Sequence, residues 1–458
     1  MCPNSVIPFV VVIVIVCISS VIASTMESTR LTGKLTGGLP PPMTSTEPGT
    51  WAFDTMSRRV SKEIIPRIIN DNEAELTRPT SPHRSECLLV LNDLISSLDS
   101  GSTGFLRGLA DQGPDVKLWD QILRDIPEEK RNWLDAPWVV TEFYLYRRIA
   151  EAFKFFETGY DMFAKQKAQG LVESMPNIED IAGRLPGLLA SDDKAAIVEL
   201  AVLTSLWGNK MDLSLWPAAK AQTSDDGNIE SAERINEALS SNKPFILDDH
   251  TAEVVERLVK PTSAAAGSKG TVDVVVDNAG YELVSDMVLG YCLLEAGACD
   301  KVRFHTKGHP TFVSDATNKD CFETIGFLCD AEASATASLA AKMKDYAETG
   351  AFEFIEDLFW CQPTAMWDMP DHIQERLAGS LTTFVKGDAN YRRLLGERQW
   401  PLYTSAQDVL SYWPVPVCAL RTFKAEIGCG VSAEAQARAA ASDDKWMVSG
   451  KWGVVQTN

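Results

Sequence analysis

The spacing of apolar residues divides the chain into two parts with different periodicity. From Trp51 to about Trp216, apolar residues recur every three or four positions, as in the run Ile64–Ile69, and this spacing places side chains on one face of a helix. After Ser240 the apolar runs become short, and each ends in a polar cluster before a longer helical segment. Strands that alternate with helices need crossover connections, so the second part predicts a largely parallel sheet.

Five apolar runs of the second part are the predicted strands. They are Pro244–Leu247, Val272–Val276, Val302–Phe304, Leu381–Val385 and Val415–Leu420. We therefore expect an α/β protein in which an N-terminal helical lobe, residues 51–225, packs on a three-layer α/β/α lobe, residues 226–450. The boundary between the lobes is predicted near residues 216–240.

The N-terminal segment differs from the rest of the chain. Residues 1–25 form an apolar leader, and its first 23 residues resemble a secretory signal peptide. The apolar run is short for a membrane span, no Lys or Arg precedes it, and the chain contains no N-x-S/T sequon. A cytoplasmic location and secretion therefore both stay open. Residues 26–50, which include the turn-forming sequence GGLPPPMTSTEPGT, are predicted to be a flexible linker.

Composition excludes some classes of partner. The chain is 45% hydrophobic and carries a formal net charge of -20, which is typical of a folded protein and would repel a polyanion. We therefore expect no nucleic-acid partner and no stable membrane partner. The ten cysteines form no C-x-x-C pair and are expected to be buried free thiols, which favours a reducing compartment.

The residues that follow the predicted strands indicate where chemistry should occur, because ligands of open α/β sheets bind beyond the carboxyl ends of the strands. These segments are Asp248-Asp249, Asp277-Asn278, Lys307 with Asp315, Lys386-Gly387-Asp388, and Arg421-Thr422-Phe423-Lys424. Carboxylates gather after the early strands and cations after the later ones.

Two kinds of site can be built from these residues. Asp277, Asn278 and Asp315 supply the oxygen ligands that hard divalent cations prefer, although Asp277-Asn278 could also be a turn and helix cap. Arg392, Arg421 and Lys424 are candidate phosphate ligands, although each alone could lie in a solvated loop. Their coincidence at one edge of a sheet favours metal-assisted phosphoryl transfer.

Several motifs resemble the damage-control phosphatases, specifically subfamily III, the sugar-phosphate phosphatases that also carry the name protein-glutamate O-methyltransferase. The similarity spans about Trp51 to Val431. The motifs are WLDAPW at 133–138 with Glu142 and Tyr146-Arg147-Arg148, LWGNK at 206–210 with DLS at 212–214, DNAGYE at 277–282, FVSD at 312–315, KGDANYR at 386–392 and RTFK at 421–424. The last is similar to the Arg-Thr-x-Lys signature of that subfamily.

The resemblance implies roles for residues and a substrate class. Asp277, Asn278 and Asp315 would hold the metal and act in catalysis, with Mn²⁺, Ni²⁺, Co²⁺ or Mg²⁺ as cofactor. The substrate pocket would be lined by Glu282, Asp388, Ala389, Asn390, Tyr391, Arg392, Arg421, Thr422 and Lys424. The implied substrate is a small phosphorylated metabolite, fructose 1-phosphate or fructose 6-phosphate. This chain departs from the pattern at Thr311, where an aromatic residue is usual, and in its apolar N-terminus, since relatives look cytosolic.

Two alternative functions stay open at this point. The subfamily's second name implies carboxyl methyl transfer from S-adenosylmethionine, although no Gly-rich methyltransferase loop follows the first predicted strand. A non-catalytic metabolite-binding protein is the other alternative. The attacking nucleophile is also open, as is whether Asp277 or Asp249 acts as a base.

Overall fold

The molecule is built around one seven-stranded sheet. The computed structural model describes residues 38–78, 80–81, 86–208, 243–260 and 269–458. The strands are β1 (Ile246–Asp249), β2 (Thr271–Val275), β3 (Lys301–Lys307), β4 (Phe352–Asp357), β5 (Ser380–Lys386), β6 (Val417–Thr422) and β7 (Gly453–Thr457). Their order is β1-β7-β6-β5-β2-β3-β4. Strands β6, β5, β2, β3 and β4 are parallel, which confirms the predicted fold class.

Two strands run against this parallel set. Strand β7 is antiparallel to β6, and β1 is parallel to β7. Strand β1 therefore runs toward the end of the sheet where the parallel strands begin, and β7, β6 and β5 lie between it and β2. Asp249 is thus not placed to act as a base beside Asp277. Strands β4 and β7 were not predicted, and β7 also lies beyond residue 450, where the α/β lobe was predicted to end.

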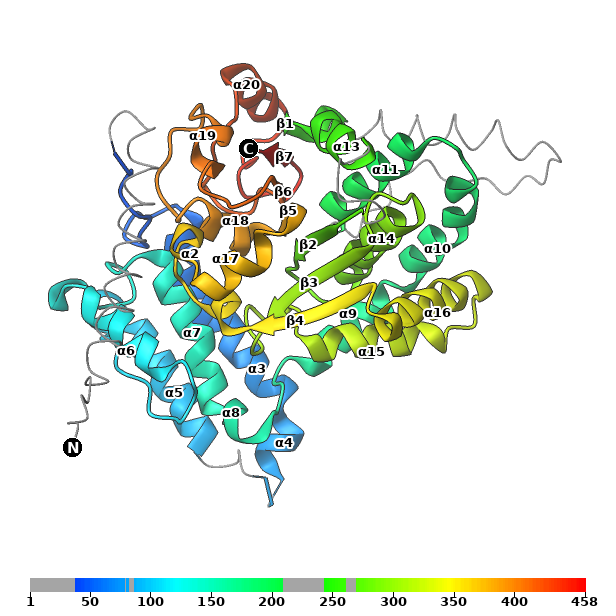
Figure 1. Cartoon of the computed structure of the whole chain (residues 1–458). Coiled ribbons are helices and arrows are strands. Elements are labelled where there is room, and N and C mark those ends of the chain that lie inside the picture. The colour runs from blue at the N-terminus through cyan, green and yellow to red at the C-terminus, as the bar shows by residue number, and fades with distance from the viewer. Residues whose placement is uncertain (1–37, 79, 82–85, 209–242, 261–268) are drawn as a thin grey trace, which may run out of the picture.

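Helices cover both faces of the sheet (Figure 1). Val274 belongs to the core shared with α10 (Met175–Leu189), α11 (Lys194–Trp207), α13 (Thr251–Val259) and α14 (Tyr281–Glu295). Its neighbour Val275 faces the opposite core, because successive side chains of a strand alternate between faces. That core includes α17 (Asp371–Leu377), α18 (Asp388–Leu394), α19 (Ala406–Leu410) and α20 (Ala433–Ser442). Helices α15 (Asn318–Cys329) and α16 (Ser334–Thr349) complete the layers near β4.

A group of N-terminal helices packs against the second core. It comprises α2 (Trp51–Asp54), the π-helical stretch η1 (Thr55–Ile64), α3 (Ile65–Asp71), α4 (Glu73–Thr77), α5 (Glu86–Asp99), α6 (Val116–Asp125), α7 (Trp138–Ala152) and α8 (Phe155–Thr158). The next helix, α9 (Ala164–Glu173), packs its Leu171 into the first core. Helices α10 and α11 belong instead to a layer of the sheet, although residues 51–225 were predicted to form one helical lobe. The predicted boundary at residues 216–240 lies outside the described residues.

The predicted linker is ordered where the structure describes it. The Met43 amide donates to Glu397 O at 3.0 Å, and the Trp138 amide donates to Met43 O at 2.9 Å. Residues 38–50 therefore dock on the folded body, which corrects the prediction of a flexible segment there; the leader at 1–25 lies outside the described residues. Among the helices of the described part, none has the length and apolar character needed to span a bilayer.

Candidate active site

The predicted metal ligands meet at the carboxyl ends of β2 and β3. Asp277 and Asn278 follow β2 after one intervening residue, Val276. Asn278 forms an isolated antiparallel bridge with Asp315 in the loop after β3. The Ala316 amide donates to Asp277 O at 2.8 Å. Asn278 Nδ2 donates to Asp277 Oδ2 at 3.0 Å and to Glu282 Oε2 at 2.7 Å. These bonds bring two carboxylates and one amide together, as the rule on strand ends predicts.

Burial makes this cluster electrostatically costly. Asp277 and Asp315 are both buried, and burial, with Asp315 and Glu282 as neighbouring negative charges, raises the pKa of Asp277 well above its ordinary value. The Nζ atom of Lys307 lies 2.8 Å from Asp315 Oδ2 and 3.9 Å from Asp277 Oδ1. Asp277 Oδ1 is buried and accepts no hydrogen bond from any described residue. Lys307 alone therefore does not balance the negative charge of the cluster, and a further positive charge would stabilise it.

Gly387 allows Asp277 to occupy this position. Its φ is +82°, and a Cβ built on it would lie 1.9 Å from Asp277 Oδ2. The β5–α18 turn therefore needs glycine for two reasons, namely its left-handed backbone and its contact with the carboxylate.

Gly387→Ala is expected to displace the Asp277 carboxylate and to lower kcat/KM for the phosphatase reaction that the resemblance implies by roughly 100-fold, since a displacement of about 1 Å in an active site can cost that much. Gly350→Ala is the matched control, because Gly350 has φ +80° with no atom close to its would-be Cβ. The control should lower the thermal midpoint less than Gly387→Ala does, because it introduces no clash, and should leave kcat/KM nearly unchanged. Equal activity losses in the two variants would show that contact with Asp277 is unimportant.

The loop that carries Asp315 contains two strained residues. Phe312 has φ +47° and Val313 has φ +70°, and a β-branched residue rarely adopts this region. The Ser314 amide donates to Phe312 O at 2.8 Å, which makes a γ-turn centred on Val313, a rare and strained turn. Backbone strain of this kind persists only where surrounding contacts impose it, and it concentrates at functional sites.

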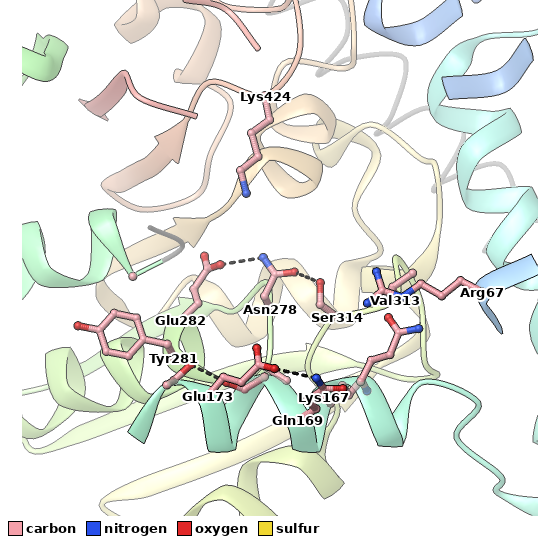
Figure 2. Close-up of a pocket in the computed structure, with 16 residues that line it drawn as sticks. Arg67, Lys167, Gln169, Glu173, Asn278, Tyr281, Glu282, Val313, Ser314 and Lys424 are labelled. Carbon is pink, nitrogen blue, oxygen red and sulfur yellow. Dashed lines mark hydrogen bonds between the residues drawn. The ribbon is translucent and has the colours of Figure 1, made fainter. Parts of the chain in front are cut away.

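A cavity of about 340 Å³ opens beside the cluster. Asn278, Glu282, Ser314 and Lys424 line it from the α/β part of the chain. Figure 2 shows Lys424 extending toward Glu282 and Asn278 from the side opposite α9. Acidic groups and a lysine therefore share one cavity that is large enough for a small phosphorylated molecule.

The other predicted pocket residues support this cavity without lining it. Arg421 is buried, donates to Asp388 Oδ1 at 2.8 Å and to Ala425 O at 3.0 Å, and stacks on Tyr391. Asp388 Oδ1 also accepts from the Lys424 amide at 3.4 Å. Arg421 and Asp388 therefore brace the loop of Lys424, and Arg421 is not available as the phosphate ligand that we predicted.

The α18 residues are held in a similar way. Arg392 is buried, donates to Glu142 and Glu397 at 2.5 Å each, and stacks over Trp138, so the geometry does not support its predicted role as a phosphate ligand. Asn390 donates to Val276 O at 3.0 Å, and Tyr391 donates to Gln456 at 2.6 Å. Ala389 is partly buried and Thr422 is buried, and neither lines the cavity.

Sequence reasoning missed the wall that α9 and α3 provide. Gln166, Lys167, Gln169 and Glu173 of α9 line the cavity together with Arg67 of α3. Their polar spacing is that of any solvated helix face, and no signal in the sequence places them beside residues more than 100 positions away. Lys386, which was predicted to follow a strand, is buried. Its Nζ lies 3.7 Å from Glu282 and 3.3 Å from Asp286.

The residues at the cluster fit a divalent cation. No group of three or more His, Cys, Asp or Glu side chains in the described ranges has metal-binding geometry. The candidate set is instead two carboxylates and the Asn278 amide, whose Nδ2 faces the carboxylates while its Oδ1 accepts from Ser314, so the amide must turn to offer its oxygen to a cation. Hard cations accept this mixture, and Asp277 Oδ1, which accepts no hydrogen bond from the described residues, supplies an open ligand position. A cation would also offset the charge that burial disfavours.

Comparison with known proteins agrees with these features. The family model "Damage-control phosphatase ARMT1-like domain" matches residues 57–439. The damage-control phosphatase ARMT1 of Xenopus tropicalis is 32% identical over 371 residues, which cover 76% of this chain and 82% of that protein. The Homo sapiens protein of that name is 28% identical over 450 residues, which cover 91% and 98%.

A solved DUF89 family protein from Pyrococcus horikoshii aligns with a TM-score of 0.39 and 15% identity, over 87% of this chain and 98% of that one. That likeness is too low to support an argument. The family model and the curated relatives are sufficient without it, and they do not favour the methyltransferase alternative. Because the family model matches well over half of the chain, this protein belongs to the damage-control phosphatase family and carries its ARMT1-like domain.

Proposed function

We propose that this phosphatase requires a divalent cation, Mn²⁺ or alternatively Ni²⁺, Co²⁺ or Mg²⁺, and hydrolyses fructose 1-phosphate or fructose 6-phosphate. The observation that carries the proposal is the meeting of Asp277, Asn278 and Asp315 beside a cavity that Lys424 also lines. These three residues would hold the cation. When bound, the cation supplies Lewis-acid polarisation of a phosphoryl oxygen.

The protein's own side chains bind and orient the phosphate. Lys424 brings an ammonium into the cavity, where it can neutralise a phosphoryl oxygen as a point charge. Arg421 and Asp388 fix the loop of Lys424 from behind. Ser314 Oγ donates to Asn278 Oδ1 and thereby orients the amide. Phosphoryl transfer needs this kind of positioning and charge neutralisation more than covalent chemistry.

The far wall suits the sugar part of the substrate. Gln169 Nε2 donates to Glu173 Oε1 at 2.7 Å, and both residues line the cavity opposite Lys424 (Figure 2). Amide and carboxylate groups of this kind can exchange hydrogen bonds with hydroxyls. A phosphate at Lys424 with a hydroxylated body toward α9 would thus use both sides of the cavity.

A phosphate-release assay over a panel of metals and sugar phosphates tests the proposal. We expect turnover of fructose phosphates that depends on an added cation and disappears with a chelator. Turnover that persists in excess chelator would contradict the metal requirement, and cation-dependent turnover of other phosphomonoesters but not fructose phosphates would contradict the substrate. Binding of fructose phosphates with no turnover under any cation would support the metabolite-binding alternative.

Lys424→Met is expected to lower kcat/KM about 10- to 100-fold, because a hydrogen bond to a charged group contributes about 1.5–3 kcal/mol. The loss should appear largely in KM if Lys424 grips the phosphate equally in the ground state and the transition state. Lys344→Met is the control, since the Lys344 side chain is 61% exposed on α16. A Lys424 variant as active as this control would remove Lys424 from the phosphate site.

A further inference from the structure

The strained turn at Phe312 and Val313 is locked by the N-terminal helices. The ring centroid of Phe312 lies 4.7 Å from that of Phe143 in an edge-on arrangement and 4.8 Å from that of Tyr146. Both partners belong to α7, and both are buried. Aromatic pairs at these distances attract one another beyond their apolar contact area.

The turn is also tied directly to the residues proposed to hold the cation. The Ala279 amide donates to Ser314 O at 2.7 Å, and the Asp315 amide donates to Thr311 O at 3.3 Å. Ser314 Oγ donates to Asn278 Oδ1. A movement of the Phe312 ring therefore shifts Ser314 and Asp315 together, and with them the side-chain oxygen of Asn278.

The intrinsic preferences of Phe312 and Val313 do not explain the backbone of this turn. Neither Phe312 nor Val313 favours positive φ, and a free loop of this sequence would relax to ordinary backbone angles. Val313 lines the cavity and also packs against the edge of the core, but it makes no aromatic contact with α7. The contacts of the Phe312 ring with α7 oppose relaxation from one side, and the hydrogen bonds of Ser314 O and the Asp315 amide hold the other side of the turn.

We propose that Phe312, held between Phe143 and Tyr146, is a positioning residue that sets Asp315 and Ser314 for cation binding. Helix α7 thereby controls the affinity of the site although none of its residues lines the cavity. This inference rests on the proposed function, because it assumes that Asp277, Asn278 and Asp315 hold a cation. It assigns no contact with substrate to Phe312 or Tyr146.

Calorimetric titration of the metal-free full-length chain with Mn²⁺ tests the inference without an activity assay. Phe312→Leu and Tyr146→Leu are each expected to raise the Kd for Mn²⁺ about tenfold, the low end of the effect of residues that orient metal ligands. Tyr146→Phe keeps the ring and should bind Mn²⁺ as the unmodified protein does. Phe153→Leu is the matched control, since Phe153 is buried in the helical part and stacks on Tyr160.

The outcomes separate the inference from the proposed function. Phe153→Leu should lower the thermal midpoint but leave the Kd unchanged. If Phe312→Leu and Tyr146→Leu bind Mn²⁺ as tightly as the unmodified protein, the positioning role is wrong and the proposed function stands. A Tyr146→Phe variant as weak as Tyr146→Leu would assign the effect to the hydroxyl and also overturn it. If the unmodified protein binds no Mn²⁺, both proposals fail.

Discussion

Asp277→Asn is expected to lower kcat/KM for a fructose phosphate by on the order of 10³-fold. A cation in such a site stabilises the transition state by several kcal/mol, and each 1.36 kcal/mol changes the rate tenfold. Asparagine has nearly the same volume, so the packing around position 387 is retained. The substitution also removes a buried carboxylate whose pKa is raised by burial and by Asp315 and Glu282. The thermal midpoint of the metal-free protein should therefore be unchanged or higher.

Asp273→Asn is the matched control for this experiment. Asp273 lies four residues earlier, in β2, where it pairs with Arg303 at 2.8 Å and His305 at 2.7 Å. Its substitution should destabilise the fold, because it weakens a buried ion pair, while kcat/KM stays within a few fold. Steady-state phosphate release should thus fall strongly in Asp277→Asn but not in Asp273→Asn. The thermal midpoint should fall in Asp273→Asn but not in Asp277→Asn. A fully active Asp277→Asn enzyme would contradict the role of Asp277.

Lys307→Met is expected to lower the free energy of unfolding of the metal-free protein by about 3–5 kcal/mol. The Lys307 side chain is fully buried and pairs with Asp315 at 2.8 Å, and removal of one partner leaves an uncompensated buried charge. The loss of a positive neighbour should also strengthen attraction of a cation to Asp277 and Asp315. Added Mn²⁺ should therefore raise the thermal midpoint of Lys307→Met more than that of the unmodified protein.

Arg147→Met provides the comparison. The Arg147 side chain is equally buried and pairs with Asp111 at 2.7 Å and Asp115 at 2.8 Å, away from the cavity-lining residues. It should destabilise the protein to a similar extent, but its midpoint should respond to Mn²⁺ no more than that of the unmodified protein. Equal Mn²⁺ responses in Lys307→Met and Arg147→Met would argue against a cation site beside Lys307.

The sheet could be predicted from sequence where strands are apolar and buried. Strands β2, β5 and β6 lie near the centre and are mostly apolar, as parallel strands covered on both faces are, although Asp273 interrupts β2 and Thr382-Thr383 interrupt β5. Strand β4, with sequence FEFIED, is an edge strand whose acidic residues break the apolar pattern. The reversed direction of β1 depends on its pairing with β7 some 200 residues later, which local periodicity does not encode.

The sequence predicted the cluster of metal ligands better than it predicted the phosphate ligands and the cavity wall. Asp277, Asn278 and Asp315 follow neighbouring strands, so the rule on strand ends brings them together. Whether Arg421 and Arg392 are free to bind phosphate depends on their partners Asp388, Glu142 and Glu397. The sequence alone could not distinguish a buried ion pair from a phosphate ligand. The wall from α9 and the aromatic contacts of Phe312 arise only from packing of the N-terminal helices.

An anomalous difference map at the manganese absorption edge, from crystals of the full-length chain soaked in Mn²⁺, tests the central claim most directly. The account predicts one strong peak beside the cavity, between side-chain oxygens of Asp277, Asn278 and Asp315. A fully occupied peak elsewhere, with none between these three side chains, would contradict it.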